Sequence, residues 1–468
     1  MPTNKMTTLD SFSTIESADC VETCPLNPSI ITCCTYQLVT NTTTNTSTET
    51  STNTTTHHQQ QQHKGTIYHF KIIQSSHLEL VQTLSSLPYG IFDMKYHPYY
   101  PLLAVCQTNR TLSIYHVKGK DYSELEFICD YSFHESGMMT SVDWNDHRDD
   151  ELLSTQLLLT CGDSYGHVHV LELLNFSSIM DTDMHTGHKA LHSLSSSPLD
   201  SGNIQTAVSL SSTCQLDSNN HNVQLSHLYT FSNAHECECW TSAFHYFNSK
   251  LMYSGGDDSL FKLYDIHNQK SIFKSMNMHA SGICCIQHSP FKEFEFYTGS
   301  YDDTLKVWDC RMFSASQMSS SCGSSCGSNS SHREMRGFQP IHTFELGGGV
   351  WNIKPNVSSL LRTSPLRNNP SSLIATATMY NGFHVLDISN QTIVAHYLPE
   401  DNLLSYGIDW CGSVLEMHHH DDDDTNLVDD HLSTNHIEFV RKDSNRLYLA
   451  TCTFYDGTLR LIQMDLEE

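Results

Sequence analysis

The chain has 468 residues, 38% of them hydrophobic, and its formal net charge is −27 with histidine neutral. So acidic a chain would be repelled by phosphate backbones and anionic lipids, which argues against nucleic-acid-binding and membrane-surface proteins. The length exceeds that of one ordinary core, so several domains or a repeat architecture are expected. No secretory h-region opens the sequence, and no stretch reaches the ~18 apolar residues of a membrane span. The 17 cysteines are therefore expected to be free thiols in a reducing, cytoplasmic setting.

Strand patterns begin near the start of the chain. Residues 18–26 (ADCVETCPL) and 29–39 (SIITCCTYQLV) are each expected to form a strand, and GTIYHFKI at 65–72 resumes the pattern. Between them, residues 41–63 are rich in Thr, Asn and Gln. Such a tract cannot bury enough apolar surface to offset chain entropy, so we expect a disordered insertion there.

Two later segments repeat each other. LMYSGGDDSLFKLYDI (Leu251–Ile266) aligns with EFYTGSYDDTLKVWDC (Glu295–Cys310), and the pair Tyr264-Asp265 recurs 44 residues later as Trp308-Asp309. Each segment has an apolar run, a turn of small residues with Asp, and strict alternation, which predicts strands. A spacing of roughly 40–45 residues with a terminal Trp-Asp is typical of WD-repeat blades.

Further copies of this pattern predict an all-β fold, a seven-bladed WD-repeat β-propeller that forms a single domain over residues 1–468. The other copies are Leu102–Val117, Leu157–Leu173, Leu373–Ile388, Leu447–Met464 and the interrupted copy at the start. The last copy stops after its third strand, so we expect Met6–Ile15 to supply its outer strand. Further disordered insertions are expected at residues 181–226, 313–337 and 418–430.

Gly162-Asp163-Ser164-Tyr165-Gly166 matches the G-x-S-x-G pattern of serine esterases. A nucleophile elbow requires a strand, a sharp turn and then a helix. The residues after Gly166, HVHVLEL, alternate as a strand does. In the repeat alignment, Gly162 to Ser164 occupy the place of Gly256 to Asp258. We therefore interpret the match as a turn between two strands.

Other polar residues are interpreted as structural. Cys237-Glu238-Cys239 and Cys284-Cys285 belong to first-strand patterns, where core packing is favoured over metal binding. No Walker loop, H-E-x-x-H or dinucleotide fingerprint occurs, so no metal and no cofactor are expected. Asp143 and Asp409 recur at the same blade position, which favours a structural hydrogen bond to a turn.

Tyrosines recur in the turns that follow the second strand of a copy. These turns cluster at one end of a propeller channel, and acidic neighbours such as Asp302 and Asp456 would make that end suitable for a cationic ligand. Ordinary packing at the rim is the alternative. The tyrosines are Tyr36, Tyr301, Tyr380 and Tyr455.

Four stretches carry a resemblance to a known family. They are ADCVETCPL with TCCTYQLV at the start, GGGVWNIK (Gly347–Lys354), YGIDW (Tyr406–Trp410) and LATCTFYDGTLRL (Leu449–Leu461). Together they resemble diphthine methylesterase, the WD-repeat family of diphthamide biosynthesis that also carries the name diphthine methyltransferase. One departure is Thr23, where a Trp is expected; another is the segment NIKPN (Asn352–Asn356), which lacks the expected apolar pattern.

The resemblance implies a cytoplasmic carboxylic ester hydrolase without a cofactor. It would hydrolyse the methyl ester of methylated diphthine on translation elongation factor 2 to give diphthine and methanol. The expected partner is therefore elongation factor 2, with no nucleic acid and no membrane. The alternative is a non-catalytic WD-repeat scaffold that recruits protein partners, because most propellers bind proteins and no catalytic triad is legible.

Ester hydrolysis needs an activated water or nucleophile and donors for the developing oxyanion. The trimethylammonium group of the implied substrate would suit an aromatic or acidic cage. The candidate bases are His235 and His279. The candidate substrate-binding residues are Tyr301, Asp302, Gly348, Gly349, Trp351, Tyr406, Tyr455 and Asp456.

Overall fold

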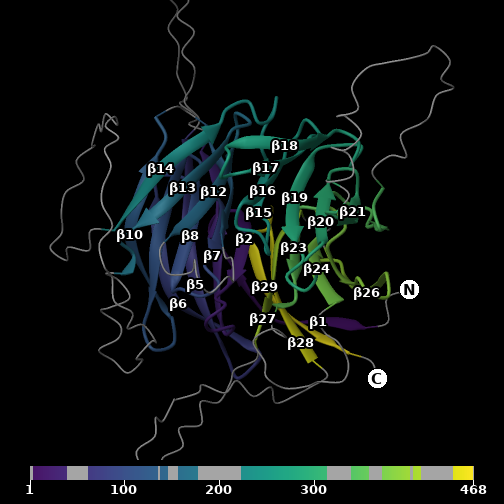
Figure 1. Ribbon diagram of the computed structural model, residues 1–468. Helices are drawn as coiled ribbons and strands as arrows, with labels where there is room; N and C mark the ends of the chain where they lie inside the picture. Colours follow the sequence, from purple (N-terminus) through teal and green to yellow (C-terminus); the bar gives the residue numbers. More distant parts are fainter. Residues whose placement is uncertain are drawn as a thin grey trace, which may run out of the picture.

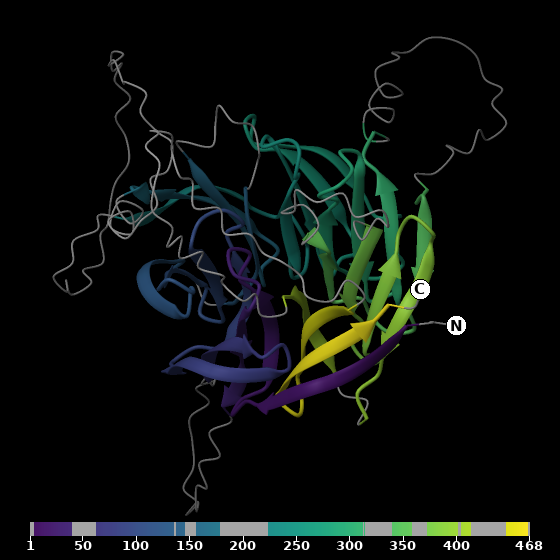
Figure 2. The same ribbon diagram turned by 90° about the horizontal axis from the view of Figure 1, so that it is seen from below.

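The computed structural model describes residues 4–39, 62–134, 137–145, 156–177, 223–311, 313, 339–357, 372–400, 404–412 and 446–466. Within these ranges the chain is nearly all strand. The strands form seven antiparallel sheets that follow one another around a common centre (Figures 1 and 2). The predicted all-β, seven-bladed β-propeller is therefore confirmed.

Each blade is built outward from an innermost strand that lines the centre. Blade 1 comprises β2 (Ala18–Thr23), β3 (Ile30–Thr35), β5 (Gln62–Ile73) and β6 (His77–Leu87), with the short β4 (Gln37–Val39) beside β5. Blade 2 comprises β7 (Ile91–Tyr96), β8 (Leu102–Gln107), β9 (Thr111–Lys118) and β10 (Glu124–Ser132). Blade 3 comprises β11 (Met139–Trp144), β12 (Leu157–Asp163), β13 (Val168–Leu174) and β14 (Gln224–Phe231).

The remaining blades repeat this order. Blade 4 comprises β15 (Thr241–Phe244), β16 (Leu251–Gly255), β17 (Phe261–Asp265) and β18 (Lys270–Ser275). Blade 5 comprises β19 (Ile283–His288), β20 (Glu295–Ser300), β21 (Thr304–Asp309) and β22 (His342–Glu345). Blade 6 comprises β23 (Asn352–Pro355), β24 (Leu373–Ala377), β25 (Phe383–Asp387) and β26 (Thr392–Tyr397). Blade 7 comprises β27 (Ser405–Cys411), β28 (Arg446–Thr453), β29 (Thr458–Asp465) and β1 (Lys5–Ser13).

The seventh blade is assembled from both ends of the chain. Strand β1 pairs antiparallel with β29, with Lys5 opposite Asp465 and Ser13 opposite Thr458. Figure 2 shows the purple first strand lying along the yellow last strands. The prediction that the segment near Met6–Ile15 supplies the missing outer strand is confirmed, with the strand ending at Ser13. This pairing covers the edge that β29 would otherwise expose.

The sequence predicts four disordered segments, and most residues of each lie outside the described ranges. Their margins belong to the fold: β5 begins at Gln62 and β14 at Gln224. Phe313 is buried against Phe261 and Phe296, with ring centroids 5.8 and 5.6 Å away. Apolar side chains at these margins can join the core, which composition averaged over a long segment conceals.

The G-x-S-x-G segment connects β12 to β13. Gly166 adopts a φ of 76°, in the left-handed region that favours glycine. The Ser164 hydroxyl accepts a hydrogen bond from the backbone N–H of Met138 at 3.0 Å. Strand β13 starts two residues after Gly166. The segment is therefore a turn between strands, as interpreted from the sequence.

Candidate functional site

The innermost strands surround a central channel that contains a cavity of about 100 Å³. Five of these strands carry a β-bulge near the same end of the channel, which leaves one extra residue outside the regular pairing. The bulges lie between Ala18 and Cys20, Ile91 and Asp93, Met139 and Ser141, Ile283 and Cys285, and Ser405 and Gly407. The extra residues are Asp19, Phe92, Thr140, Cys284 and Tyr406, and the first four line the cavity.

Five aromatic rings follow one another at this end of the channel, and we call them the aromatic collar. The ring centroids are 6.2 Å apart for Phe92 and Tyr36, 5.6 Å for Tyr36 and Phe454, and 5.4 Å for Phe454 and Tyr406. They are 4.8 Å apart for Tyr406 and Trp351, and 6.1 Å for Trp351 and Phe92, which completes the circuit. All five side chains are partly exposed. Neighbouring rings are inclined to one another by 28° to 69°. A regular pentagon with sides of this length has its centre about 5 Å from each corner, which is within the ~6 Å separation of a cation from a ring face in a cation–π contact.

Two further rings contact the collar. Trp240 lies 6.0 Å from Phe92 and 5.7 Å from Trp351, and Tyr301 lies 6.2 Å from Trp351. The indole N–H of Trp240 donates to Asp257 at 3.1 Å. The seven rings come from blades 1, 2, 4, 5, 6 and 7. The collar therefore depends on closure of the whole propeller.

A buried carboxyl group lies beside the collar. Asp19 is 2% exposed, lines the cavity, and neither of its carboxyl oxygens has a hydrogen-bond partner among the described residues. Burial, assisted by the charge of Asp93, holds the pKa of Asp19 well above its usual range. Burial also raises the pKa values of Tyr36 and Tyr406, and the charge of Asp19 adds to both shifts. Asp19 is thus close to two residues of the collar.

Sequence reasoning missed Asp19. Its signal was an acidic residue within an otherwise apolar first strand, in ADCVETCPL. That strand is buried at every position from Ala18 to Thr23, so a carboxyl group there carries a desolvation cost with no compensating bond. Such a group is more typical of a functional site than of a structural one.

Charged side chains continue along the channel beyond the collar. The ammonium group of Lys354 bonds the carboxylate of Glu22 and lies 4.0 Å from Asp409. Burial alone would lower the pKa of Lys354, but Glu22 and Asp409 raise it overall. Burial raises the pKa of Asp93 to about 7, although a hydrogen bond from the backbone of Val142 opposes the shift. Channel charges therefore comprise a compensated pair and a carboxyl group that titrates near neutrality.

Aspartates on the innermost strands also connect neighbouring blades. The backbone N–H groups of Val142, Phe244 and Thr23 donate to Asp93, Asp143 and Asp409 at 2.9, 2.9 and 2.8 Å. The sequence interpretation of Asp143 and Asp409 as structural acceptors is correct, but the donor is the next blade's innermost strand and not a turn. Sequence alone does not show which neighbouring strand lies within reach.

The two candidate bases occupy equivalent positions inside blades 4 and 5. His235 contacts Asp258 through Nδ1 at 2.9 Å and the Ser254 hydroxyl through Nε2 at 2.7 Å. In the next blade, His279 contacts Asp302 at 2.9 Å through Nδ1 and Thr298 at 2.7 Å through Nε2. Both histidine side chains are fully buried. With both ring nitrogens occupied, this geometry favours a structural role for each histidine.

The acidic candidates are also held within blades. Asp302 accepts hydrogen bonds from the backbone N–H of Ala280 and from Thr304, in addition to its contact with His279. Burial raises the pKa of Asp302, but the bonds from His279 and Thr304 outweigh it and the pKa is lowered. Asp456 pairs with Arg460 at 2.7 Å. Neither carboxylate lines the channel cavity.

The remaining candidates do meet at the channel mouth. Trp351 and Tyr406 stack at 4.8 Å in the collar, Tyr301 supports Trp351, and Tyr455 lies next to Phe454 with 65% of its surface exposed. A side chain at Gly348 would collide with the carbonyl oxygen of Thr378. A Cβ at Gly349 would lie 2.8 Å from the sulfur of Met379. The glycine run therefore allows the segment before Trp351 to pack closely against the β24–β25 turn.

Comparison with known proteins agrees with this architecture. A family model described as WD domain, G-beta repeat, matches residues 270–309. A human protein named diphthine methyltransferase is 29% identical over 185 residues, which cover 38% of this chain and 33% of the human one. A Dictyostelium discoideum homologue is 26% identical over 247 residues, and a Saccharomyces cerevisiae relative is 27% identical over 244, each covering 49% of this chain and 50% of its own.

The chain is a WD-repeat homologue of the proteins named diphthine methyltransferase. The resemblance expected from the sequence is confirmed. The matched part spans about a third to a half of the length of these relatives. A chain of the crystal structure of the mitotic checkpoint complex superposes with a TM-score of 0.53 at 12% identity, covering 100% of this chain and 94% of that one. At that identity the likeness shows the propeller fold alone.

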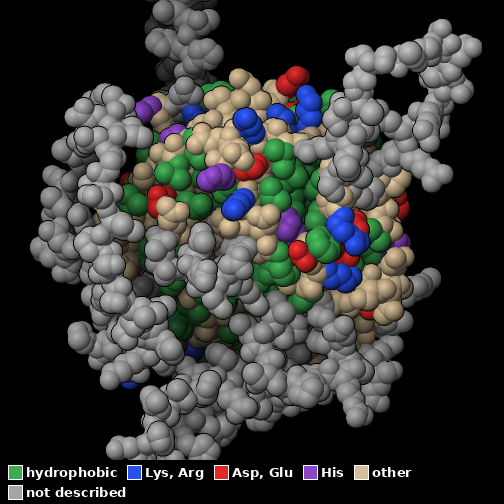
Figure 3. All heavy atoms as spheres, viewed as in Figure 1, with side chains coloured by type: hydrophobic (Ala, Val, Ile, Leu, Met, Phe, Trp, Pro, Cys, Tyr) green, Lys and Arg blue, Asp and Glu red, His purple; other side chains and the backbone are tan. Residues whose placement is uncertain are grey.

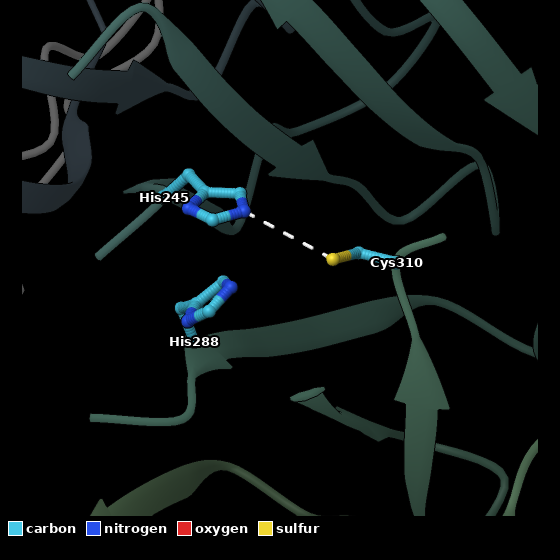
Figure 4. A group of neighbouring side chains, drawn as sticks. All are labelled: His245, His288 and Cys310. Carbon is cyan, nitrogen blue, oxygen red and sulfur yellow. Dashed lines mark hydrogen bonds between the residues drawn. The ribbon is translucent and has the colours of Figure 1, made fainter. Parts of the chain in front are cut away.

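Two groups of side chains outside the collar bring possible metal ligands together. Figure 4 shows His245, His288 and Cys310 at the ends of neighbouring strands, with His245 Nε2 4.0 Å from the Cys310 sulfur. The Nδ1 atom of His245 accepts the backbone N–H of Phe247 at 3.1 Å, so the proton of the neutral ring lies on Nε2, facing the thiol. In the other group, Asp163 with His167 and His169, the guanidinium of Arg110 bonds Asp163 at 2.5 Å. Both arrangements fit hydrogen-bonded packing.

The outer surface carries charges of both signs (Figure 3). On the face shown in Figure 3, basic and acidic side chains lie among apolar ones and form no extended basic area among the coloured residues. No helix in the described ranges is long and apolar enough to cross a membrane. The strongest concentration of unusual chemistry in the described residues is therefore the aromatic collar with Asp19.

Proposed function

We propose that the protein acts in diphthamide biosynthesis by hydrolysing the methyl ester of methylated diphthine on translation elongation factor 2. The products are diphthine and methanol. The observation that carries this proposal is the aromatic collar with the unpartnered carboxyl group of Asp19 beside it. The homology to proteins named diphthine methyltransferase supports the pathway.

The collar suits the cationic part of the implied substrate. A trimethylammonium group has no N–H to donate, so it is held by aromatic faces and by exclusion of water, not by hydrogen bonds. Five partly exposed rings around one point offer such a surface. The net charge of −27 would also draw a cation toward the propeller before contact. Trp351 and Tyr406 are proposed to contact the ammonium, with Tyr455 at the rim.

The carboxyl groups near the collar suit ester hydrolysis. In methylated diphthine the ester is attached to the carbon that carries the ammonium group, so binding of the ammonium brings the ester close to Asp19 and Asp93. The channel cavity of about 100 Å³ is smaller than the roughly 300–1,000 Å³ of most small-molecule pockets. It is large enough for a water molecule, which needs about 30 Å³. These features favour water, and not a bulky methyl donor, as the co-reactant in the channel.

The test uses the purified full chain with elongation factor 2 that carries either methylated diphthine or the free acid. Mass spectrometry of the modified peptide and an assay of methanol follow the ester. The proposal expects loss of the methyl ester with one methanol per molecule and no change in the free-acid form. An intact ester after prolonged incubation with folded protein would exclude the esterase.

A non-catalytic scaffold is the second candidate. Its support is a group of exposed aromatic side chains on turns between second and third strands, with Tyr165, Tyr380 and Tyr455 exposed by 48%, 57% and 65%. Exposed tyrosines are frequent where propellers bind proteins. Under this interpretation elongation factor 2 binds but the methyl ester stays intact. The same assay, combined with a binding measurement, separates the two functions.

A further inference from the structure

We propose that Asp93 and Asp19 form the acid–base pair of this hydrolysis, with Asp93 activating the water and Asp19 protonating the departing methoxide. The inference rests on the proposed function, because the pair has no reaction to serve if no ester is cleaved. Neither aspartate belongs to a recognisable catalytic motif of the sequence.

Asp19 and Asp93 lie at the same end of the channel. Asp19 lies at the bulge of β2 and Asp93 directly follows the bulge of β7, in neighbouring blades, and both line the channel cavity. Phe92 of the collar immediately precedes Asp93 in the chain. The charge of Asp19 acts on Tyr36 and Tyr406 of the collar, so a group bound in the collar lies at the end of the channel where the pair is placed.

The two carboxyl groups differ in their hydrogen bonding. Asp93 is fixed through Oδ2, which accepts the backbone N–H of Val142 at 2.9 Å, and its side chain is partly exposed to the channel. Asp19 is almost fully buried and neither of its oxygens has a partner among the described residues. A carboxyl group buried without a partner favours its neutral, protonated form. The fixed and partly solvated Asp93 is the one suited to ionise.

Other charged and titratable groups surround the pair. Glu22, Lys95 and Lys354 lie along the channel beyond Asp93, and Lys354 is bonded to Glu22. On the collar side, the phenols of Tyr36 and Tyr406 have raised pKa values, mainly through burial, and stay neutral. The Cys20 thiol also has a raised pKa, first through burial, and carries no charge near neutrality. Asp143 and Asp409 also have pKa values raised mainly by burial, that of Asp409 to about 6. Both accept a backbone N–H of the next blade, whereas Asp19 has no partner among the described residues, so the pair is assigned from its bonding and position.

The chemical step balances within the pair. The Asp93 carboxylate takes a proton from water as the water oxygen forms a bond to the ester carbonyl carbon. The tetrahedral intermediate collapses by breaking the bond from that carbon to the methoxy oxygen. The protonated Asp19 gives its proton to this oxygen, so methanol leaves. The new acid then ionises and its proton reprotonates Asp19. Asp93 releases the proton that it took from water to the solvent, so the pair returns to its starting state with one net proton released per ester cleaved.

Charge also explains product release. The ester is neutral, whereas the product carries a carboxylate beside Asp19 and Asp93. Two like charges within a few ångströms repel each other strongly in a partly desolvated channel. The product would therefore leave the site more readily than the substrate.

The experiment compares Asp19→Asn and Asp93→Asn with wild type. Ser164→Ala is the control variant, because the Ser164 hydroxyl that it removes lies in the β12–β13 turn. Asn keeps the size of each side chain, and at position 93 it keeps an oxygen to accept the Val142 N–H. Methanol release and binding of ester-bearing elongation factor 2 are measured for each, with circular dichroism to confirm folding. We expect kcat to fall by about 100-fold or more for both Asn variants, the magnitude typical of general acid–base groups, with binding retained within about threefold.

The pH profile gives a readout that a structural role would not move. Wild-type kcat should rise with pH through about 7 as Asp93 ionises and fall at higher pH as Asp19 loses its proton. The alkaline fall should disappear in Asp19→Asn, and Asp19→Glu should recover part of the rate.

The outcomes distinguish the two proposals. If wild type releases methanol and Asp19→Asn does so within about threefold of it, the acid–base pair is wrong and the esterase stands. If wild type releases none, both are wrong. Should Asp93→Asn fail to fold, Asp19→Asn still decides, because neither carboxyl oxygen of Asp19 has a hydrogen bond to lose among the described residues.

Discussion

Asp409 on the innermost strand of the last blade accepts a hydrogen bond at 2.8 Å from the backbone N–H of Thr23 on the innermost strand of the first. The same connection joins blade 2 to blade 3 through Asp93, and blade 3 to blade 4 through Asp143. Together with the β1–β29 pairing, the Asp409 bond closes the ring of blades where the last blade meets the first. Closure in turn brings Tyr36 of blade 1 against Phe454 of blade 7 in the collar.

Removal of this bond should therefore lower stability. Asp409→Ala leaves the Thr23 N–H buried without an acceptor, which costs roughly 1–3 kcal/mol in the free energy of unfolding. Asp409→Asn keeps an acceptor and should cost less. Urea denaturation measures both, with Asp265→Ala as the control because that carboxylate bonds the local turn residue Asn268 at the surface. Equal stability of Asp409→Ala and wild type would refute the connection.

The histidine networks give a second prediction. His279 joins Asp302 to Thr298, whose hydroxyl also accepts the indole N–H of Trp308 at 2.8 Å. His279→Ala and the equivalent His235→Ala should lower the melting temperature by several degrees, because each leaves buried polar groups unpaired. The rate of methanol release per folded molecule should change by less than about threefold. A thousandfold loss at an unchanged melting temperature would instead support the histidines as bases.

The blades could be predicted because each copy repeats a strand pattern with a turn of small residues, and the pair Trp308-Asp309 is a strong marker. The role of β1 as the outer strand of blade 7 could be predicted because the last copy of the pattern contains only three strands. The collar could be predicted only in part, since Trp351 and Tyr406 stood beside unusual glycines, whereas Phe92 and Phe454 look like ordinary strand residues. Asp19 was missed because its role depends on a bulge, and a bulge is a property of pairing between strands.

The third prediction concerns the apparent esterase motif. Ser164→Ala should leave methanol release within a few-fold of wild type, because Ser164 lies between β12 and β13 with no helix behind it to form an elbow. Its hydroxyl accepts the Met138 N–H, so a small loss of stability is expected. The assay is the methanol measurement described above. Loss of activity by a thousandfold in folded protein would reinstate the serine as a nucleophile.

A fourth prediction links Asp19 to pH-dependent stability. Burial holds its folded-state pKa well above the usual 3.8, so the folded state binds the proton more tightly than the unfolded state does. This contribution favours the folded state fully below the unfolded pKa and is lost as pH rises toward the folded pKa. Asp19→Asn removes the titration. Its melting temperature should exceed that of wild type by a few degrees at pH 8, and the difference should shrink at pH 4.

Thermal unfolding at the two pH values, followed by circular dichroism, measures this difference. Asp409 also has a raised pKa, mainly through burial, and is present in both proteins. Asp93 interacts with Asp19, so loss of the Asp19 charge also eases the ionisation of Asp93, which adds to the gain of the variant at pH 8. A variant less stable than wild type at pH 8 would mean that the Asp19 carboxylate has a partner in solution. Greater stability with lost activity would show that the residue is kept for function at a cost to the fold.

The last prediction tests the collar through one ring. Tyr406 stacks on Trp351 at 4.8 Å and lies 5.4 Å from Phe454, so it is a member of the collar that is proposed to hold the ammonium. Tyr406→Phe keeps the aromatic face, whereas Tyr406→Leu keeps much of the volume and loses the quadrupole. A desolvated cation–π contact contributes up to about 2 kcal/mol, and 1.4 kcal/mol corresponds to about tenfold in affinity. We expect Tyr406→Leu to raise KM about tenfold or more, and Tyr406→Phe to stay within about threefold of wild type. Tyr165→Leu is the matched control, since that exposed tyrosine lies on a turn of blade 3, outside the collar. Equal KM values for the Phe and Leu variants would show that the ring acts by shape alone and that no cation is held by its face.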